Sequence, residues 1–365
     1  MNELLIFINV IPESIKIGLI YSIMAMGVYI TYKILDFPDL TVDGSFPLGG
    51  FVFAYFALSS YSPFVGLVFS IIAGAIAGLI TGVFHVKCGI DKLLAGILTM
   101  ITLYSVNARI VDKPSIFIDA NKSIYGVISY EHHFLLFFII SIVLLALKVL
   151  YDYNIKKNKY VIKSFLIYVV ILLVLCYYTY YTEDISMYLT VLIVFIIKLV
   201  MDYILTSKFG FILRALGDNE NIVTGLGVNS DKLKILGLML SNALVSLSGA
   251  LFTQYIRVID LSSSVGTMVI GLASIIFGLG IIKKSNIINH ISIVIVGSIV
   301  YYIVINFALN SSGITEILLT ALHFSEQTIS KFSVKPTDVK IITALLLGII
   351  LAIDNKKKKK KKKVK

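Results

Sequence analysis

The sequence predicts an all-α polytopic membrane protein, and three observations support this prediction. The 365 residues are 58% hydrophobic and only 15% charged, and their mean hydropathy is +0.94, far above that of a soluble globular domain. A hydrocarbon core about 30 Å thick requires roughly 20 apolar residues in a helix. Segments of this length recur along nearly the whole chain. We therefore expect about 9–11 transmembrane helices and almost no room for a soluble domain.

Taken in order, the apolar segments predict spans near 14–34, 44–60, 63–86, 91–111, 133–151, 160–182, 185–206, 232–255, 265–283, 287–308 and 337–354. The weakest is 44–60, which is short and begins with Gly44 and Pro47. It suits a half-helix after a break, so a broken helix is expected near 36–60. Residues 1–11 are apolar but too short to span, and they suit an interfacial start rather than a signal peptide.

The distribution of Lys and Arg predicts the orientation. Basic residues gather on alternate connections, on the side of the C-terminal tail, at Lys87, Lys92, Lys148, Lys156, Lys157, Lys159, Lys163, Lys208, Arg214, Lys232, Lys234, Lys283 and Lys284. That side is expected to be cytoplasmic, which places the N-terminus outside. We expect one transmembrane domain over 1–355 with a polar loop at about 206–232, in a membrane whose cytoplasmic side carries the C-terminal tail.

The Lys-rich tail, 356–365, accounts for most of the formal net charge of +11. Its nine lysines suit a solvated stop-transfer run or attraction to anionic membrane lipid. Nucleic-acid binding is not expected, because these charges belong to a tail and not to a folded face interleaved with aromatic residues.

No catalytic constellation is visible. The sequence contains no G-x-x-x-x-G-K-[ST], G-x-S-x-G or H-E-x-x-H motif, and its two cysteines, Cys88 and Cys176, have no metal-ligand spacing. We expect no cofactor, no metal site and no ATP hydrolysis by this chain. Charges in the middle of the spans look scarce, which favours a permease driven by a separate ATPase. The alternative is an ion-coupled secondary transporter, in which Asp36, Asp39 and Asp43 would bind a cation.

One polar insert, RALGDNENIVTGLGVNSDKLK from Arg214, interrupts the apolar sequence. Asp218 or Asn219 can cap a short helix, Gly227 can end it, and Asn229 or Ser230 can cap the next span. We expect a helix along the cytoplasmic surface that passes motion from a docked partner into the membrane.

The stretch TSKFGFILRALGDNENIVTGLGVNSDKLKILGLMLSNALVSLSGALFTQY resembles the cytoplasmic loop and following span of ABC-importer permeases of the branched-chain amino acid and ribose type. FPDLTVDGSFPLGGFVFAY, KLLAGILTMITLYSVNARI and GTMVIGLASIIFGLGI are also similar to segments of this family, especially its tryptophan-type and uncharacterised amino acid permeases. The resemblance does not cover about 112–183. Relatives commonly carry an acidic residue where Leu279 and Gly280 stand.

The resemblance implies a non-catalytic permease subunit for a small solute, most simply an amino acid or a related compound. Its partners would be ABC ATPase subunits, an extracellular or periplasmic substrate-binding protein, and a second permease copy or a paralogue. The residues implied to couple the permease to the ATPase are Arg214, Ala215, Gly217, Asp218, Asn219, Gly225 and Gly227.

Small polar residues within the spans are candidates for the translocation path, namely Asp43, Ser45, Thr99, Asn107, Asn242 and Ser246. A half-helix after Gly44 would aim its positive end at an anionic group such as a carboxylate. The alternatives are an ordinary turn with capping aspartates and helix packing by small residues, the latter expected for the run Gly74, Gly78, Gly82. Modified amino acids, nucleosides and small sugars stay open as solutes.

Overall fold

The computed structural model describes residues 2–128, 130–154, 161–261, 266–282 and 288–309, together with Ile341, Ala344, Leu345 and Gly348. The predicted span at 337–354, the loop 309–336 and the tail 356–365 therefore lie outside the described residues, apart from Leu309 and these single positions. Within the described ranges, eight helices are long and apolar enough to cross a membrane: Val10–Ile34, Pro63–Val86, Lys92–Ile110, Tyr130–Tyr153, Val161–Thr182, Ser186–Thr206, Ser230–Ile256 and His290–Ala308. The protein is an all-α polytopic membrane protein, as predicted.

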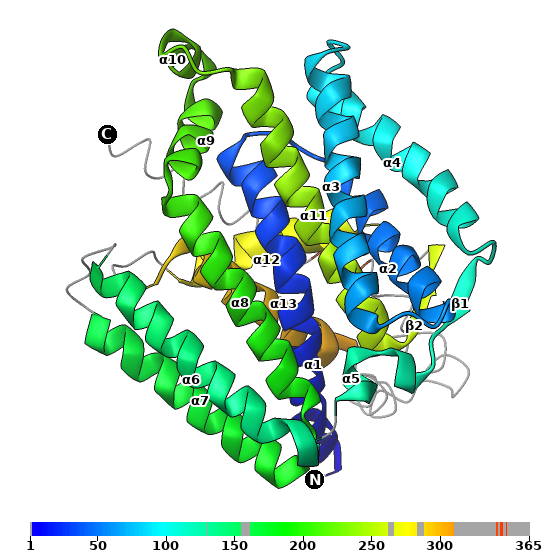
Figure 1. Cartoon of the computed structure of the whole chain (residues 1–365), viewed down its shortest axis with the longest axis vertical. Helices are drawn as coiled ribbons and strands as arrows, with labels where there is room; N and C mark the ends of the chain where they lie inside the picture. The colour runs from blue at the N-terminus through cyan, green and yellow to red at the C-terminus, as the bar shows by residue number, and fades with distance from the viewer. Residues whose placement is uncertain are drawn as a thin grey trace, which may run out of the picture.

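The elements run in chain order as α1 (Asn2–Val28), η1 (Tyr29–Ile34, a π-helix), α2 (Val42–Leu58), α3 (Pro63–Val86), α4 (Lys92–Ile110), β1 (Ser115–Phe117), η2 (Ala120–Lys122), α5 (Ile124–Val127), α6 (Tyr130–Asn154), α7 (Val161–Thr182), α8 (Ser186–Thr206), α9 (Lys208–Asp218), α10 (Glu220–Gly225), α11 (Ser230–Ile256), β2 (Val258–Asp260), α12 (Thr267–Ile281) and α13 (His290–Leu309). Figure 1 shows α9 and α10 at the opposite end of the molecule from the N-terminus.

The centre of the fold is α11, which packs against α1, α2 and α3. Small residues allow these backbones to approach closely. A Cβ at Gly74 or Gly78 of α3 would overlap the carbonyl oxygen of Asn242 or Leu238 of α11. The run of glycines in α3 is therefore a packing surface, as predicted.

The crossing of α2 and α11 is tighter still, because glycines on both helices face the other backbone. A Cβ at Gly49 would overlap the carbonyl oxygen of Ser246, and a Cβ at Gly249 would overlap that of Phe46. The two helices thus touch backbone to backbone, with no room for a side chain at either position.

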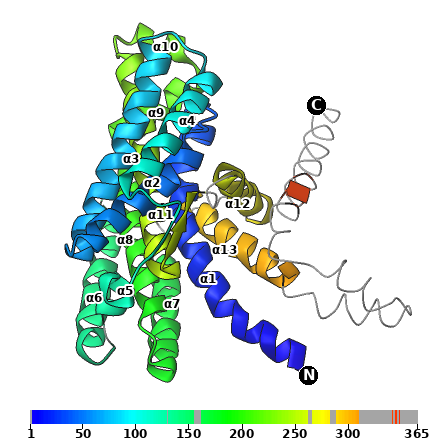
Figure 2. The same ribbon diagram turned by 90° about the vertical axis from the view of Figure 1, so that its right-hand side faces the viewer.

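Two of the predicted spans are short helices that begin inside the molecule. The chain leaves η1 at Asp36, where φ is +51°, and α2 starts only at Val42. This is the predicted break. The second, α12, starts beside Asp43 near the beginning of α2, and it packs along α13 and α1 (Figure 2). Because α2 has 17 residues and α12 has 15, neither covers a full hydrocarbon thickness of about 30 Å.

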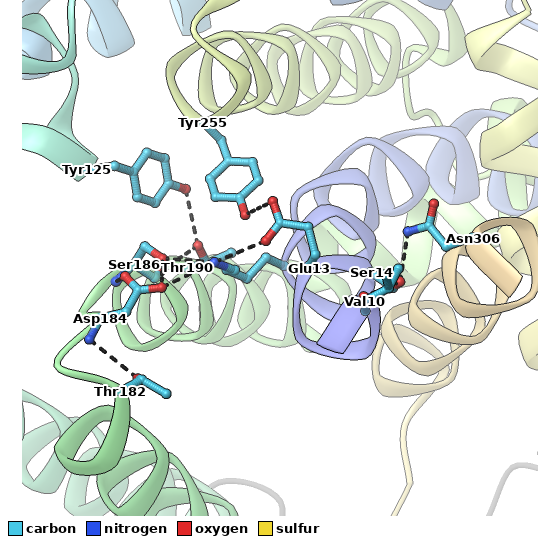
Figure 3. A network of polar contacts seen from close by, with 11 residues as sticks. Val10, Glu13, Ser14, Tyr125, Thr182, Asp184, Ser186, Thr190, Tyr255 and Asn306 are labelled. Atoms are coloured by element: carbon cyan, nitrogen blue, oxygen red, sulfur yellow. Dashed lines mark hydrogen bonds and ion pairs between the residues drawn. The ribbon is translucent and has the colours of Figure 1, made fainter. Parts of the chain in front are cut away.

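A two-stranded antiparallel sheet lies beside α2, in the half of the molecule away from α10 (Figure 1). Strands β1 and β2 pair with Ile116 opposite Ile259, and α5 is tied to α11 by hydrogen bonds from Ser123 and Ile124 to Gln254. In the same half of the molecule, Figure 3 shows Tyr255 hydrogen-bonded to Glu13, with Asp184 nearby. The Nζ of a buried lysine, Lys16, lies 3.3 Å from Glu13 and 3.2 Å from Asp184. These contacts tie α1 to α8 and α11.

Helices α6 and α7 form a hairpin at the left edge of Figure 1, and a buried ionic cluster joins α6 to α8. Lys148 Nζ lies 3.0 Å from Asp152 and 3.7 Å from Asp202, and Lys198 Nζ lies 2.8 Å from Asp202. All four side chains are 4–7% exposed. The expectation that charges within the spans are scarce is therefore wrong for these helices, and Lys148 does not mark an open cytoplasmic connection. The i,i+4 spacing of Lys and Asp in both helices was the signal in the sequence.

Candidate functional site

A buried carboxylate organises the chain where it breaks between η1 and α2. Asp39 is 1% exposed and accepts hydrogen bonds from Thr41 N (3.0 Å) and Asn242 Nδ2 (2.7 Å). Asn242 also accepts from Ser45 Oγ (2.7 Å) and donates to the Leu238 carbonyl (3.1 Å). Because a polar group buried without partners costs about 1–3 kcal/mol, this network specifies how α2 meets α11.

A second polar chain links the same break to α3 and α4. The hydroxyl of Thr41 is 2.7 Å from that of Thr81, which in turn donates to Thr99 (3.0 Å). Ser246 of α11 donates to the carbonyl of Ser70 in α3 (2.6 Å). Sequence reasoning did not identify Thr41 or Thr81, because a lone threonine in an apolar segment carries no pattern.

The structure divides the predicted path residues into two groups. Four of them, Ser45, Thr99, Asn242 and Ser246, are at most 1% exposed and hydrogen-bonded to other parts of the chain. Their place on a path stays a prediction. The other two, Asp43 and Asn107, line one cavity.

This cavity has a volume of about 370 Å³ and lies between the start of α2, the middle of α4 and Leu261. Its volume falls within the range of small-molecule sites, about 300–1,000 Å³. The wall is formed by Asp43, Gly44, Pro47, Met100, Ile101, Tyr104, Ser105, Asn107 and Leu261. The exposed fractions of Ile101 (57%) and Tyr104 (58%) place its opening on the outer side of α4.

The two short helices meet at Asp43. Its Oδ1 accepts hydrogen bonds from Thr267 Oγ1 (2.9 Å) and Met268 N (2.7 Å), and its Oδ2 accepts one from Gly266 N (3.2 Å). The positive end of α12 is therefore occupied by a carboxylate of the chain itself. At the start of α2, the carboxylate of Asp39 likewise accepts a hydrogen bond from the backbone amide of Thr41.

At the other end of the molecule, the polar insert folds as α9 and α10 with the predicted caps. The Asn219 side chain accepts from Asn221 N (3.0 Å), that of Asn229 accepts from Lys232 N (2.9 Å), and Gly227 has a φ of +76° after α10. Arg214 donates to the carbonyls of Gly210 (3.1 Å) and Leu205. Arg214 thus holds α9 against the end of α8.

Gly217 determines how α9 sits on the membrane-spanning helices. A Cβ at this position would overlap the carbonyl oxygen of Ile34, the last residue of η1. Beyond this contact, α10 carries exposed apolar side chains, Ile222 at 59% and, just after the helix, Leu226 at 76%. Neither Gly225 nor Gly227 has an atom within 4 Å of its Cβ position among the residues described. The insert is therefore anchored at α9 and open at α10.

An ion pair joins α10 to α11 and predicts a small pH dependence of the stability of the fold. Lys234 Nζ donates to Glu220 Oε1 (2.6 Å), and this hydrogen bond lowers the pKa of the Glu220 carboxyl. A carboxyl with a lowered folded-state pKa stabilises the fold above its unfolded pKa, and this stabilisation is lost as the pH falls through the folded pKa. Because Glu220 is half-exposed, we expect Lys234→Met to cost less than about 1 kcal/mol at neutral pH.

The measurement is thermal unfolding of the wild type and of Lys234→Met in detergent, at neutral pH and at a pH below the folded pKa of Glu220. The difference between the two proteins should vanish in acid. Lys232→Met, two residues away, is the matched control and should show no such pH-dependent difference. A difference for Lys234→Met that persists in acid would contradict this account.

Comparison with known proteins places these features in a family. Residues 11–351 match the family described as branched-chain amino acid transport system / permease component. The chain is 35% identical over 349 residues to a tyrosine transport system permease protein of Clostridioides difficile (strain R20291), covering 95% of this chain and 91% of the relative. It is 28% identical over 335 residues to an uncharacterised protein of Rickettsia prowazekii (strain Madrid E), covering 91% and 100%. No solved structure matches.

Proposed function

The chain belongs to the family of branched-chain amino acid transport system permease components, and on this premise we propose that it is the transmembrane subunit of an ATP-driven ABC importer. ATP is hydrolysed by separate ATPase subunits, and the permease itself is non-catalytic. An extracellular or periplasmic substrate-binding protein delivers the solute. A second copy of the chain, or a paralogue, covers the outer side of α4 and encloses the path.

The observation that carries this proposal is the exposed apolar surface of α10. Ile222 and Leu226 stand out from an otherwise polar insert that lies outside the helices long enough to span a membrane. Exposed apolar side chains at the tip of a polar segment suit a protein partner, because contact with the partner removes them from water. Anchoring of α9 by Arg214 and Gly217 connects this surface mechanically to α8 and η1.

The proposed setting follows from this assignment. The α10 end faces the cytoplasm of a bacterial cell, where the ATPase binds, and the N-terminus and the β1–β2 sheet face outward. The solute is an amino acid, with an aromatic amino acid favoured by the similarity to a tyrosine transport system permease protein.

The test is recovery of an ATPase subunit, after co-expression of this chain with the genes that neighbour it and purification through a tag on the permease. Replacement of both apolar residues, Ile222→Asp with Leu226→Asp, is expected to reduce recovery at least about tenfold, because two contact residues of this kind contribute about 2 kcal/mol or more. Neither side chain is buried, so the permease should fold normally.

The matched control is Phe117→Asp, an exposed apolar position (77%) in β1 at the opposite end of the molecule. Recovery of the ATPase should be unchanged in this variant. Two outcomes would count against a docking surface at α10. One is that the double variant recovers as much ATPase as the wild type, and the other is that Phe117→Asp loses as much ATPase as the double variant.

One observation favours the alternative of an ion-coupled secondary transporter. Asp39 is a buried carboxylate with no basic side chain in contact with it among the described residues, and buried carboxylates in membrane helices often carry protons or ions. The discriminating measurement is uptake into cells or vesicles. Uptake that persists without ATP but is dissipated by an ionophore would support this alternative, whereas uptake that requires ATP and survives the ionophore supports the importer.

A further inference from the structure

Asn107 presents an unused hydrogen-bond acceptor in the wall of the cavity at Asp43. Its Nδ2 donates to the carbonyl of Gly44 (3.2 Å), and because a carbonyl can only accept, this bond fixes which end of the amide faces Gly44. The residue is 1% exposed, and in the part of the chain that the structure describes no donor reaches its Oδ1. A buried acceptor without a donor costs about 1–3 kcal/mol, so this atom calls for a donor from outside the part of the chain that the structure describes.

Asp43 contributes negative charge to the same cavity. Its carboxylate has about four acceptor positions, of which the start of α12 uses three. No Lys, Arg or His is among the described residues that form the cavity wall. Among the described residues, the polar wall therefore combines a carboxylate without a basic partner and a neutral acceptor without a donor.

A ligand group that pairs with the Asp43 carboxylate and also donates to Asn107 Oδ1 must carry several donors and a positive charge. A protonated amine has three N–H donors and one charge, whereas a carboxylate or phosphate would be repelled by Asp43 and could not donate to Asn107. The two helix ends that could attract an anion are already bonded to Asp39 and Asp43. The chemistry of the cavity thus selects a cationic group over an anionic one.

The geometry points to a binding site for the protonated amine of the transported solute at Asp43 and Asn107. This assignment rests on the proposed function, since it identifies the cavity as part of the transport path. The amine lies between the Asp43 carboxylate and Asn107 Oδ1. The apolar part of the solute lies against Pro47, Met100 and Ile101, in a volume of about 370 Å³ that accommodates an amino acid.

The first experiment measures the charge preference of the cavity without any assumption about the solute. A single cysteine is placed in the wall by Ser105→Cys, in full-length chain with Cys88→Ser and Cys176→Ser. Its modification rates by a cationic and an anionic methanethiosulfonate are compared with the rates of a free thiol. We expect the cationic reagent to be favoured by about tenfold beyond the free-thiol ratio, because Asp43 concentrates cations locally.

Asp43→Asn in the same background keeps one carbonyl oxygen for the backbone of α12 and removes the charge. The ratio of the cationic to the anionic modification rate should then fall to the value measured for a free thiol. A ratio in the Ser105→Cys protein that already equals the free-thiol ratio, or a preference for the anionic reagent, overturns the assignment.

The second experiment uses ligands that differ only in their charged groups. L-tyrosine, tyramine and 3-(4-hydroxyphenyl)propionate are tested for binding to the purified full-length chain, by the shift in its unfolding temperature. Tyrosine and tyramine carry the amine and should bind, whereas the acid without the amine should bind at least about tenfold more weakly.

Asn107→Leu should weaken the binding of tyrosine and tyramine. The weak binding of 3-(4-hydroxyphenyl)propionate should not change. Equal binding of the acid and tyramine, or no binding of either amine, overturns the assignment. Because neither experiment involves the ATPase, loss of ATPase recovery and loss of amine selectivity are separate outcomes, and one proposal can fail while the other stands.

Discussion

Replacing Gly249 by alanine is expected to reduce the recovery of folded protein severely. The added Cβ would overlap the carbonyl oxygen of Phe46, and its distances to the Phe46 carbonyl carbon and Cα would be 2.8 and 3.2 Å. These are backbone atoms, so relief requires α2 and α11 to separate rather than a side chain to rotate. Overpacking costs about 1–3 kcal/mol and sometimes more, and the upper end of this range is a large part of a typical stability of about 5–15 kcal/mol.

The matched control is Gly280→Ala, another glycine within a helix, α12. No described atom lies within 4 Å of its Cβ position, and alanine favours helix by about 1 kcal/mol relative to glycine. Monodisperse protein recovered after detergent extraction is the readout for both variants. Normal recovery of Gly249→Ala would show that α2 and α11 are further apart than described.

Replacing Lys198 by methionine should destabilise the fold by about 3–5 kcal/mol, because it leaves the buried Asp202 without its nearest cation. Among the described residues, the two lysines and two aspartates of the cluster balance in charge, and removal of one lysine leaves these four positions with a net negative charge. Burial of such a charge costs far more than the loss of an exposed ion pair. Thermal unfolding in detergent measures this loss.

The double variant, Lys198→Met with Asp202→Asn, restores the charge balance and should recover most of the lost stability. Lys122→Met is the control for an exposed pair, since Lys122 and Asp119 lie 4.0 Å apart with side chains 33% and 81% exposed, and it should change the stability by less than about 1 kcal/mol. If the double variant is no more stable than Lys198→Met, charge balance does not explain the cluster.

Helices with a sharp local signal were predictable from the sequence. Eight spans follow from apolar length alone, and the break before α2 follows from the polar residues at 36–43. The predicted start of the half-helix after Gly44 was wrong, because α2 begins at Val42 and contains both Gly44 and Pro47. The caps of α10 and α11 were equally visible, because Asn219 and Asn229 act on amides two or three residues away. Local chemistry determines these features, so one sequence is enough to find them.

Features that depend on which helices become neighbours could not be predicted in the same way. Asp39 and Asn242 are separated by 203 residues, and only the approach of the η1–α2 break to α11 brings them to 2.7 Å. The cavity depends on α2, α4 and the chain after β2 at once. The same polar residue, Asn242, could line a path or join two helices, and periodicity alone does not distinguish these roles.

The contact of Gly217 with Ile34 has a consequence for how movement would pass through the molecule. Because α9 rests on the last carbonyl of η1, any tilt of α9 acts on the backbone immediately before Asp39, Thr41 and Asp43. Movement of a partner docked on α10 would therefore reach the segment that joins η1 to α2, next to the two carboxylates, Asp39 and Asp43, that bond the starts of α2 and α12.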